Sequence, residues 1–224
     1  MKSIVLCASP RRDGNSRMLG EAFAGGARAA GHDAELVDLN EVMTGLLRDC
    51  RRCRQPDGRC SIDDGYAELM HAQLLPADAW VYATPLYYYG MAASLKNFFD
   101  RLVCYASASY PQSEQVADGM RGKRSALLLS AEESNRAAPL AVVHQIQEIS
   151  RYLRQEFAGV VVGIGNTRGE VRRDPSDPVG AADELGRRLF EVHYSDYTMD
   201  SERPNAVWPV AGADGEPAGG YEDV

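Results

Sequence analysis

Hydrophobic and polar positions follow two different spacings along the chain. Short, nearly continuous apolar runs predict buried strands at residues 2–8, 34–39, 79–84, 125–130 and 159–164. Between these runs, apolar positions recur at helical spacing and predict helices at residues 16–30, 64–75, 91–105, 138–156 and 181–192. Strands that alternate with helices are typical of an open parallel sheet. We therefore predict an α/β fold with a doubly wound, five-stranded parallel sheet and helices on both of its faces.

Three segments lie outside this pattern. Residues 40–63 are irregular and hold three of the five cysteines. Residues 106–122 are rich in polar and turn-forming residues, which favours a loop at a rim or an interface. Residues 194–224 contain seven acidic residues, one arginine and too few apolar residues for a core, so we predict one domain at 1–193 and an acidic Gly/Pro-rich tail. The tail is either disordered or, because of the apolar stretch 207–210, an arm that packs on a partner subunit.

Composition narrows the classes of partner. A net charge of −8 and a pI of about 5.1 argue against nucleic-acid binding. No apolar run approaches the roughly 20 residues that span a bilayer, and the chain opens with a strand, not with a signal peptide. An odd number of cysteines fits reduced thiols better than a disulfide framework. We therefore expect a cytoplasmic protein that binds neither nucleic acid nor membranes.

The first strand leads into C-A-S-P-R-R-D-G-N-S-R at residues 7–17, which opens the first helix. A helix N-terminus presents unpaired N–H groups and favours anions. The stretch adds four neutral or cationic donors, Ser9, Arg11, Asn15 and Ser16, and so predicts a phosphate site. The alternative is an ordinary turn with a Ser or Asn cap. A dinucleotide fingerprint and a P-loop are excluded by the single glycine and the missing lysine. A cysteine phosphatase is disfavoured because Asp13 stands where an arginine is expected after Cys7.

Two motifs in this order resemble one family. S-P-R-x-x-G-N-S after the first strand is similar to the FMN phosphate loop of the NADPH-dependent FMN reductases, which have a flavodoxin-like fold. The stretch A-T-P-L-Y-Y-Y-G-M-A-A-S-L-K-N-F-F-D-R at 83–101 is similar to the T-P-x-Y, L-K and D-R of that family. The resemblance covers roughly residues 1–165. It implies FMN as cofactor, NAD(P)H as co-substrate, a small-molecule acceptor (a quinone, an azo or nitro compound, or free flavin) and a homodimer or homotetramer.

The expected flavin site lies beyond the carboxyl ends of the strands, where three loops converge. The first loop would hold the phosphate with the four donors named above. The second would flank the isoalloxazine ring with Pro85, Leu86, Tyr87, Tyr88, Tyr89 and Gly90, and Tyr88 is the catalytic candidate, as a proton or hydrogen-bond donor. The third, residues 130–135, would contribute Ser130 and Glu133. The alternatives are that the tyrosines pack a strand end or an interface and that Glu132 and Glu133 only open a helix. We read Asp100 and Arg101 as a charge pair or a dimer contact.

The irregular segment raises the question of a metal. Cys50-x2-Cys53-x6-Cys60 resembles the compact cysteine motif of iron–sulfur flavoproteins, which supplies four ligands, but one ligand is missing here. We predict no metal site. A cluster completed by another residue, or zinc with Asp63, Asp64 or His71 as fourth ligand, are the alternatives. Two further readings of the whole chain stay open: a flavodoxin-type electron carrier, and an interaction protein that has lost its cofactor.

Overall fold

The computed structural model describes residues 1–135 and 137–192. A parallel sheet forms its centre and contains strands β1 (Lys2–Cys7), β2 (Asp33–Asp38), β3 (Ala79–Tyr87), β5 (Arg124–Ala131) and β6 (Glu156–Ile164). The strands lie in the order β2-β1-β3-β5-β6, and all neighbours in this order are parallel. The order reverses between β1 and β3, as in flavodoxin-like sheets. The predicted five-stranded, doubly wound parallel sheet is confirmed.

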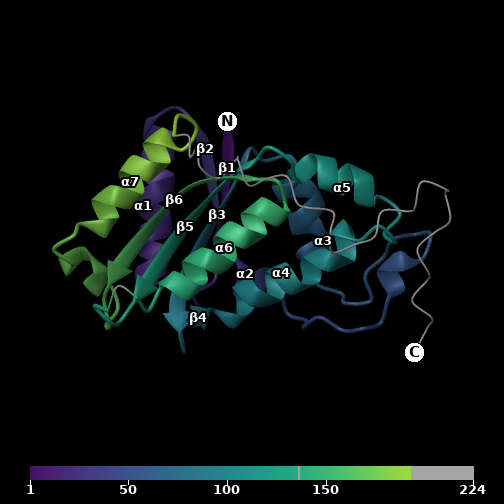
Figure 1. Cartoon of the computed structure of the whole chain (residues 1–224), viewed down its shortest axis with the longest axis horizontal. Helices are drawn as coiled ribbons and strands as arrows, with labels where there is room; N and C mark the ends of the chain where they lie inside the picture. Colours follow the sequence, from purple (N-terminus) through teal and green to yellow (C-terminus); the bar gives the residue numbers. More distant parts are fainter. Residues whose placement is uncertain (136, 193–224) are drawn as a thin grey trace, which may run out of the picture.

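Helices cover both faces of this sheet (Figure 1). One face carries α1 (Asn15–Ala29) and α7 (Pro178–Arg188). The other carries α4 (Ala93–Ala106), α5 (Ser113–Met120), α6 (Leu140–Tyr152) and the short α3 (Tyr66–Glu68), which continues into the π-helical turn η2 (Leu69–Leu74). Three further short pieces are α2 (Leu39–Val42) and the 3-10 turns η1 (Arg52–Arg54) and η3 (Glu170–Arg173).

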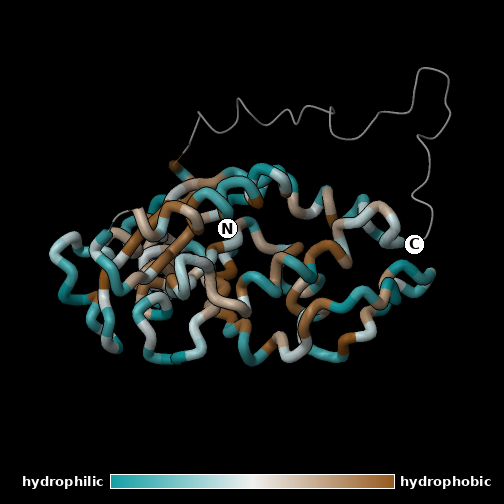
Figure 2. The backbone as a smooth tube through the Cα atoms, turned by 60° about the horizontal axis from the view of Figure 1, so that its bottom comes forward, coloured by the Kyte–Doolittle hydropathy of each residue, from teal (hydrophilic) through white to brown (hydrophobic). Residues whose placement is uncertain are grey.

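Each face of the sheet has its own hydrophobic core. The first core lies under α1 and α7, and the second lies under α3, α4, α5 and α6. Neighbouring residues of β3 enter opposite cores, Trp80 with Phe98 of α4 and Val81 with Phe23 of α1, because successive strand side chains point to opposite faces. All four side chains are completely buried. Hydrophobic residues accordingly run through the central strands, whereas the outer loops are mostly hydrophilic (Figure 2).

The end of β3 differs from the prediction that Pro85 stops the strand. The strand continues to Tyr87, and a short β4 (Gly90–Met91) turns back to pair with it in an antiparallel hairpin. Pro85 is tolerated because β1 ends opposite Ala83, so no partner strand on that side needs an N–H from residue 85. The hairpin therefore projects beyond the parallel sheet, at the lower edge in Figure 1.

Two other boundaries are corrected by the structure. The segment predicted as a polar loop at 106–122 contains α5, because Val116 and Met120, one helical turn apart, are buried against the second core. The helix predicted to reach residue 156 ends with α6, since Arg154 adopts a left-handed conformation with φ of +56°. β6 therefore begins earlier than expected.

The acidic tail lies outside the described residues, and the domain boundary at residue 193 stays a prediction. Among the helices of the described part of the chain, none is long and apolar enough to cross a membrane.

Candidate functional site

The loop between β1 and α1 is built to receive an anion. Gly14 is the N-cap of α1 and offers no side-chain cap, so the first turn of the helix leaves its N–H groups to an outside acceptor. The Oγ atom of Ser16, in this same turn, is fully buried and has no hydrogen-bond partner among the described residues. A buried hydroxyl without a partner is costly. A phosphate oxygen at this position would satisfy both the hydroxyl and the helix amides.

Short contacts fix the shape of this loop. The Ser9 hydroxyl accepts a hydrogen bond from the backbone N–H of Arg11 at 3.1 Å. A Cβ atom on Gly14 would lie 2.7 Å from that hydroxyl, so the loop requires glycine there. From outside, Asn40 donates to the carbonyl of Ser9 at 3.0 Å, and the Ser94 hydroxyl at the start of α4 donates to the carbonyl of Ala8 at 2.9 Å. The loop is therefore held from two sides before any ligand binds.

The arginines near this loop differ in their availability. Arg12 pairs with Glu41, and Arg17 pairs with Glu21 at 3.3 Å. Arg11 is exposed and forms no ion pair with any residue in the described ranges. Arg11 is thus the cation of this loop that is free to meet a phosphate.

Asn15 is committed to a structural role. Its side-chain N–H groups donate to the carbonyls of Gly165 and Thr167 at 2.8 and 3.0 Å, and its oxygen accepts from the N–H of Val171 at 3.3 Å. Both side-chain N–H groups are therefore used within the protein, and the residue ties the loop after β6 to the start of α1. Any contribution of Asn15 to an anion comes from its backbone N–H.

The second loop is the hairpin that joins β3 to β4. Tyr87 lies opposite Gly90, and the two residues between them, Tyr88 and Tyr89, both have positive φ, at +47° and +61°. This is the type I′ geometry, which Asn and Gly usually occupy, so two tyrosines here are held under strain. Tyr88 is fully exposed, and Tyr87 and Tyr89 are 42% and 58% exposed. Strained, exposed aromatic residues on a rigid strand end are suited to contact a flat ligand.

The base of the hairpin is rigid. Pro85 is buried and pairs in register with Ser130 of β5, which is also buried. The Thr84 hydroxyl accepts a hydrogen bond from the N–H of Ala92 at 3.0 Å, which closes the hairpin onto the start of α4. Leu86 is partly buried and packs against the second core. The tyrosines are therefore the outward part of an otherwise fixed element.

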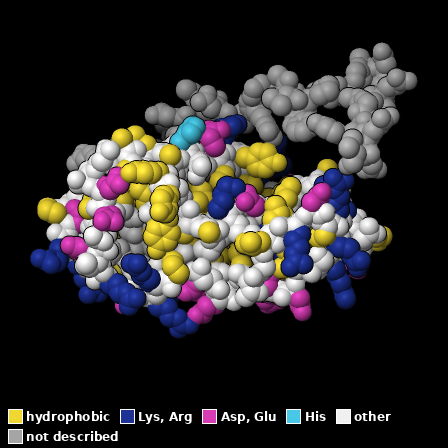
Figure 3. All heavy atoms as spheres, turned by 90° about the horizontal axis from the view of Figure 1, so that it is seen from below, with side chains coloured by type: hydrophobic (Ala, Val, Ile, Leu, Met, Phe, Trp, Pro, Cys, Tyr) yellow, Lys and Arg dark blue, Asp and Glu magenta, His cyan; other side chains and the backbone are white. Residues whose placement is uncertain are grey.

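The third loop meets the second through one side-chain pair. The Tyr89 hydroxyl donates to Oε1 of Glu133 at 2.9 Å, and this bond, with the charge of the carboxylate, raises the pKa of Tyr89. One oxygen of the Glu133 carboxylate thus has a hydrogen-bond donor from the hairpin. Figure 3 views the molecule from this side and shows hydrophobic side chains exposed among charged ones.

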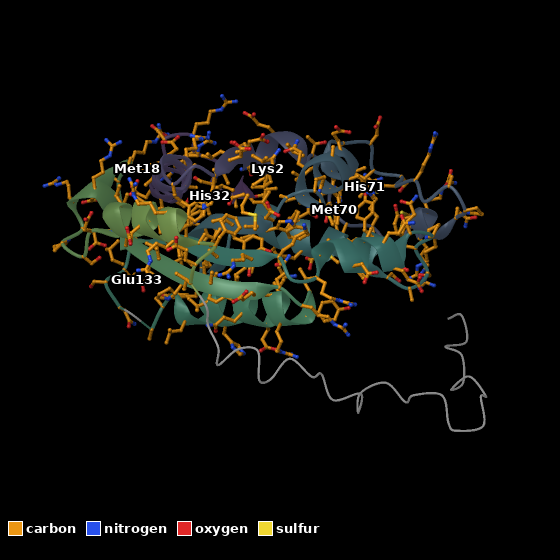
Figure 4. The ribbon with its side chains drawn as sticks, turned by 90° about the horizontal axis from the view of Figure 1, so that it is seen from above. Lys2, Met18, His32, Met70, His71 and Glu133 are labelled. Atoms are coloured by element: carbon orange, nitrogen blue, oxygen red, sulfur yellow. The ribbon has the colours of Figure 1, made fainter. Side chains whose placement is uncertain are left out.

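Neither His32 nor His71 belongs to these loops. His32 packs edge-on against Phe190 with ring centroids 4.9 Å apart, and His71 packs against Tyr105 at 5.3 Å. Figure 4 shows His71 far from Glu133. Cys7 is buried behind the first loop, and burial raises its pKa to about 12 despite the opposing effect of Arg17. Its thiol is protonated at neutral pH, which removes the nucleophile that a cysteine phosphatase needs.

We expected Asp100 and Arg101 to form a charge pair or a dimer contact, and the charge pair between them is not formed. Arg101 is buried and forms two hydrogen bonds with the buried Asp64, at 2.5 and 2.8 Å, and its guanidinium lies 4.5 Å from the ring centroid of Tyr66. Asp100 instead pairs with Lys96 on the exposed side of α4. Arg101 therefore belongs to the packing of the irregular segment on α4.

The structure thus brings the predicted loops 9–16, 84–90 and 130–135 to one edge of the sheet. Sequence reasoning missed three residues that hold these loops in place, Asn40, Thr84 and Ser94. Asn40 and Ser94 act through hydrogen bonds to residues far away in the sequence. Thr84 accepts its hydrogen bond from Ala92, eight positions away across the hairpin. The group that fits has an anionic end for the α1 N-terminus and a flat end for the hairpin. FMN has both, and the orphaned Ser16 hydroxyl lies where its phosphate would be expected.

Comparison with known proteins agrees with this geometry. The chain is 26% identical over 188 residues to YwqN of Bacillus subtilis, named as an NAD(P)H-dependent FMN-containing oxidoreductase, with 84% of this chain and 98% of that protein covered. It is 25% identical over 207 residues to an iron–sulfur flavoprotein of Archaeoglobus fulgidus, with 89% and 84% covered. The fold is similar to that of an NAD(P)H:quinone oxidoreductase from Methanothermobacter marburgensis, with a TM-score of 0.65, 22% identity, and 87% and 98% covered.

The family model described as NADPH-dependent FMN reductase matches residues 1–167, which include all three loops of the site. Together, the match and the fitted loops show that the chain is an oxidoreductase with FMN as its cofactor, and that it belongs to the NADPH-dependent FMN reductase family.

Proposed function

We propose that this oxidoreductase passes electrons from NAD(P)H through FMN to a flat, aromatic two-electron acceptor, of which a quinone is the representative case. One observation supports this choice above all: three tyrosines, Tyr87, Tyr88 and Tyr89, project from the β3–β4 hairpin at the flavin site. Planar aromatic substrates stack favourably on such rings. Azo compounds, nitro compounds and free flavin share this flatness and are the competing acceptors.

The residues of the chain bind and orient the reactants. The chemistry that FMN supplies when bound is hydride uptake from the nicotinamide and release of two electrons to an acceptor. The α1 N-terminus, Ser16 and Arg11 would hold the phosphate end, and the fixed backbone around Pro85 would meet the ring edge. Because the donors and the loop are tied down beforehand, little ordering is needed on binding.

Proton supply at the site falls to few groups. His32 and His71 pack against Phe190 and Tyr105, and the Tyr89 hydroxyl is engaged with Glu133. The Tyr88 hydroxyl is fully exposed and has no hydrogen-bond partner in the described part of the chain. We assign Tyr88 as the hydrogen-bond or proton donor to the acceptor, and solvent as the source that restores its proton.

We also propose a homodimer or homotetramer in the cytoplasm. A fully exposed tyrosine in a strained conformation, Tyr88, fits a position that a partner subunit or a substrate covers. The five cysteines are free thiols, which suits a reducing compartment.

The test is NADPH oxidation by FMN-loaded protein with a soluble benzoquinone, an azo dye or free FMN as acceptor, each at matched concentration. We expect the benzoquinone to give the fastest turnover, and Tyr88→Ala to slow it. NADPH oxidation faster with free FMN than with the quinone would make the protein a flavin supplier. Intact FMN without NADPH oxidation would make it an electron carrier, and failure to bind FMN would leave an interaction protein.

A second candidate function, an iron–sulfur flavoprotein, is favoured by one specific observation. Cys50, Cys53 and Cys60 line a single cavity, and a relative that covers most of the chain carries that name. In that case the acceptor of the flavin electrons would be a cluster in the same protein.

A further inference from the structure

The irregular segment between β2 and α3 is anchored on α4. Asp64 accepts hydrogen bonds from Arg101 and, at 3.1 Å each, from the backbone N–H groups of Thr44 and Gly45. The side-chain amide of Asn97 donates to the carbonyl of Gly45 at 3.0 Å and accepts from the N–H of Leu47 at 3.2 Å. Both ends of the cysteine-bearing loop are thereby held against the same helix.

This anchoring brings a fourth cysteine to the other three. A cavity of about 150 Å³ opens between the loop and the last turns of α4, and Cys50, Cys53, Cys60 and Cys104 all line it. The only cysteine outside the cavity is Cys7, in β1. Four thiols from two distant parts of the sequence therefore face one space.

The charge around the cavity suits an anionic occupant. Arg48, Arg51 and Arg54 also line it, against a single acidic side chain, Asp49. Thiolates that hold a metal centre carry a net negative charge that such cations offset. The arginines thus supply positive charge that metal-bound thiolates would need and that four neutral thiols would not.

Two buried donors beside the thiols lack partners. The Nε–H of Arg101 and the hydroxyl of Tyr105 are buried and form no hydrogen bond within the described residues. The N–H of Ile62 already donates to the sulfur of Cys60 at 3.4 Å. Hydrogen bonds to sulfur are the usual surroundings of an iron–sulfur cluster.

We propose that Cys50, Cys53, Cys60 and Cys104 hold an iron–sulfur cluster of the [4Fe–4S] type, with Cys104 of α4 as the fourth ligand. The sequence motif lacks a fourth cysteine because that ligand comes from a helix more than forty residues further along the chain. The earlier expectation of no metal is replaced by this proposal.

A cluster fits the cavity better than a single zinc ion. Zinc needs four ligands that converge on one point at about 2.3 Å for sulfur. In the described ranges, no three cysteine, histidine or carboxylate side chains converge in that way. Asp64 is occupied by Arg101, and His71 packs on Tyr105. Thiols distributed around a cavity are suited to surround a larger body.

The cluster site is distinct from the flavin site. Ser94, which supports the phosphate loop, and Cys104 lie ten residues apart on α4, so the two ends of this helix are separated by about 15 Å. The inference therefore does not depend on the proposed acceptor. FMN binding and cluster binding can fail independently.

The test is iron and acid-labile sulfide analysis of the full chain, purified without oxygen and reconstituted with ferrous iron and sulfide. We expect about four irons and four sulfides per chain, with broad visible absorption that dithionite bleaches. Cys104→Ser is expected to lose most of both, whereas Cys7→Ala, which removes the cysteine outside the cavity, keeps them. FMN binding by Cys104→Ser, unchanged from the parent, shows that the variant is folded.

A second measurement needs no variant. Reconstituted and metal-free protein are treated with iodoacetamide, and the labelled cysteines are identified by mass spectrometry. Protection of all four cavity cysteines by reconstitution supports the proposal. Full labelling of Cys104 in reconstituted protein, equal iron in Cys104→Ser, a disulfide between Cys53 and Cys104 in place of metal, or stoichiometric zinc would each overturn it.

Discussion

The Tyr89 hydroxyl donates a 2.9 Å hydrogen bond to Glu133, and this contact joins the hairpin after β3 to the loop after β5. We expect Tyr89→Phe to weaken FMN binding about two- to fivefold, because the hairpin loses its tie to the neighbouring loop. Glu133→Gln keeps an acceptor oxygen but removes the charge, so its effect should be smaller. Flavin fluorescence titration measures both. Weaker binding in Glu133→Gln than in Tyr89→Phe would show that charge, not the bond, matters.

The phosphate loop offers a matched pair of arginines. Arg11→Ala should raise the FMN dissociation constant about tenfold or more, since a charge-assisted hydrogen bond is lost. Arg12→Ala is the control, because Arg12 is already paired with Glu41. Ser16→Ala should also weaken FMN binding, because the Ser16 hydroxyl is expected to meet a phosphate oxygen. Without FMN, this buried hydroxyl has no hydrogen-bond partner in the described part of the protein. Isothermal titration with FMN measures each. Equal losses for Arg11→Ala and Arg12→Ala would place the phosphate elsewhere.

The strained hairpin predicts opposite effects on stability and activity. Tyr88→Asn should raise the free energy of unfolding by about 0.5–1 kcal/mol, because Asn tolerates positive φ better than Tyr. The same change should lower quinone turnover, since an aromatic contact is lost. Tyr88→Phe keeps the ring but removes the hydroxyl, so it distinguishes the effect of the hydroxyl from that of the stacking surface. Denaturant melts and steady-state rates test this; a Tyr88→Asn variant as active as the parent would argue against substrate contact.

The buried pair of Arg101 and Asp64 predicts a pH-dependent loss of stability. Burial opposes ionisation of Asp64, but hydrogen bonds from Arg101 and backbone N–H groups outweigh it and lower its pKa below 3.8. A lowered pKa in the folded state means that the stabilisation is complete above the unfolded value and is lost as the pH falls below it. We expect thermal stability to decline steeply below about pH 4.

Substitution separates this pair from a surface pair on the same helix. Asp64→Asn leaves Arg101 buried without a counter-charge and should cost about 3–5 kcal/mol. Asp100→Asn, which breaks the exposed contact with Lys96, should cost less than about 1 kcal/mol. Thermal melts at neutral pH compare them. Similar costs for the two variants would contradict the structural role of Arg101.

Local sequence patterns were sufficient to predict the parallel sheet and the loops of the site. Apolar runs and helical spacing predicted all five parallel strands, and the anion donors of residues 9–16 follow directly from the sequence. The polar stretch that forms α5 was missed because only Val116 and Met120 reach the core, too few for a clear periodic signal. The extension of β3 past Pro85 depends on where β1 ends, which a single strand does not reveal.

Long-range contacts account for what the sequence did not predict. Asn15 reads as a phosphate donor, yet its side chain binds residues 165, 167 and 171, more than 140 positions away. The sequence suggests a charge pair between Arg101 and its neighbour Asp100, but Arg101 forms its ion pair with Asp64. Cys104 joins the cysteines of the irregular segment only because that segment folds back on α4. No local periodicity encodes such approaches.

The most direct test of the central claim is the visible spectrum of FMN-loaded protein, recorded without oxygen before and after one equivalent of NADPH. We predict that the flavin bands bleach on addition of NADPH and return when a quinone is added. Flavin bands that persist in the presence of NADPH, with FMN still bound, would contradict the assignment of this site to hydride transfer.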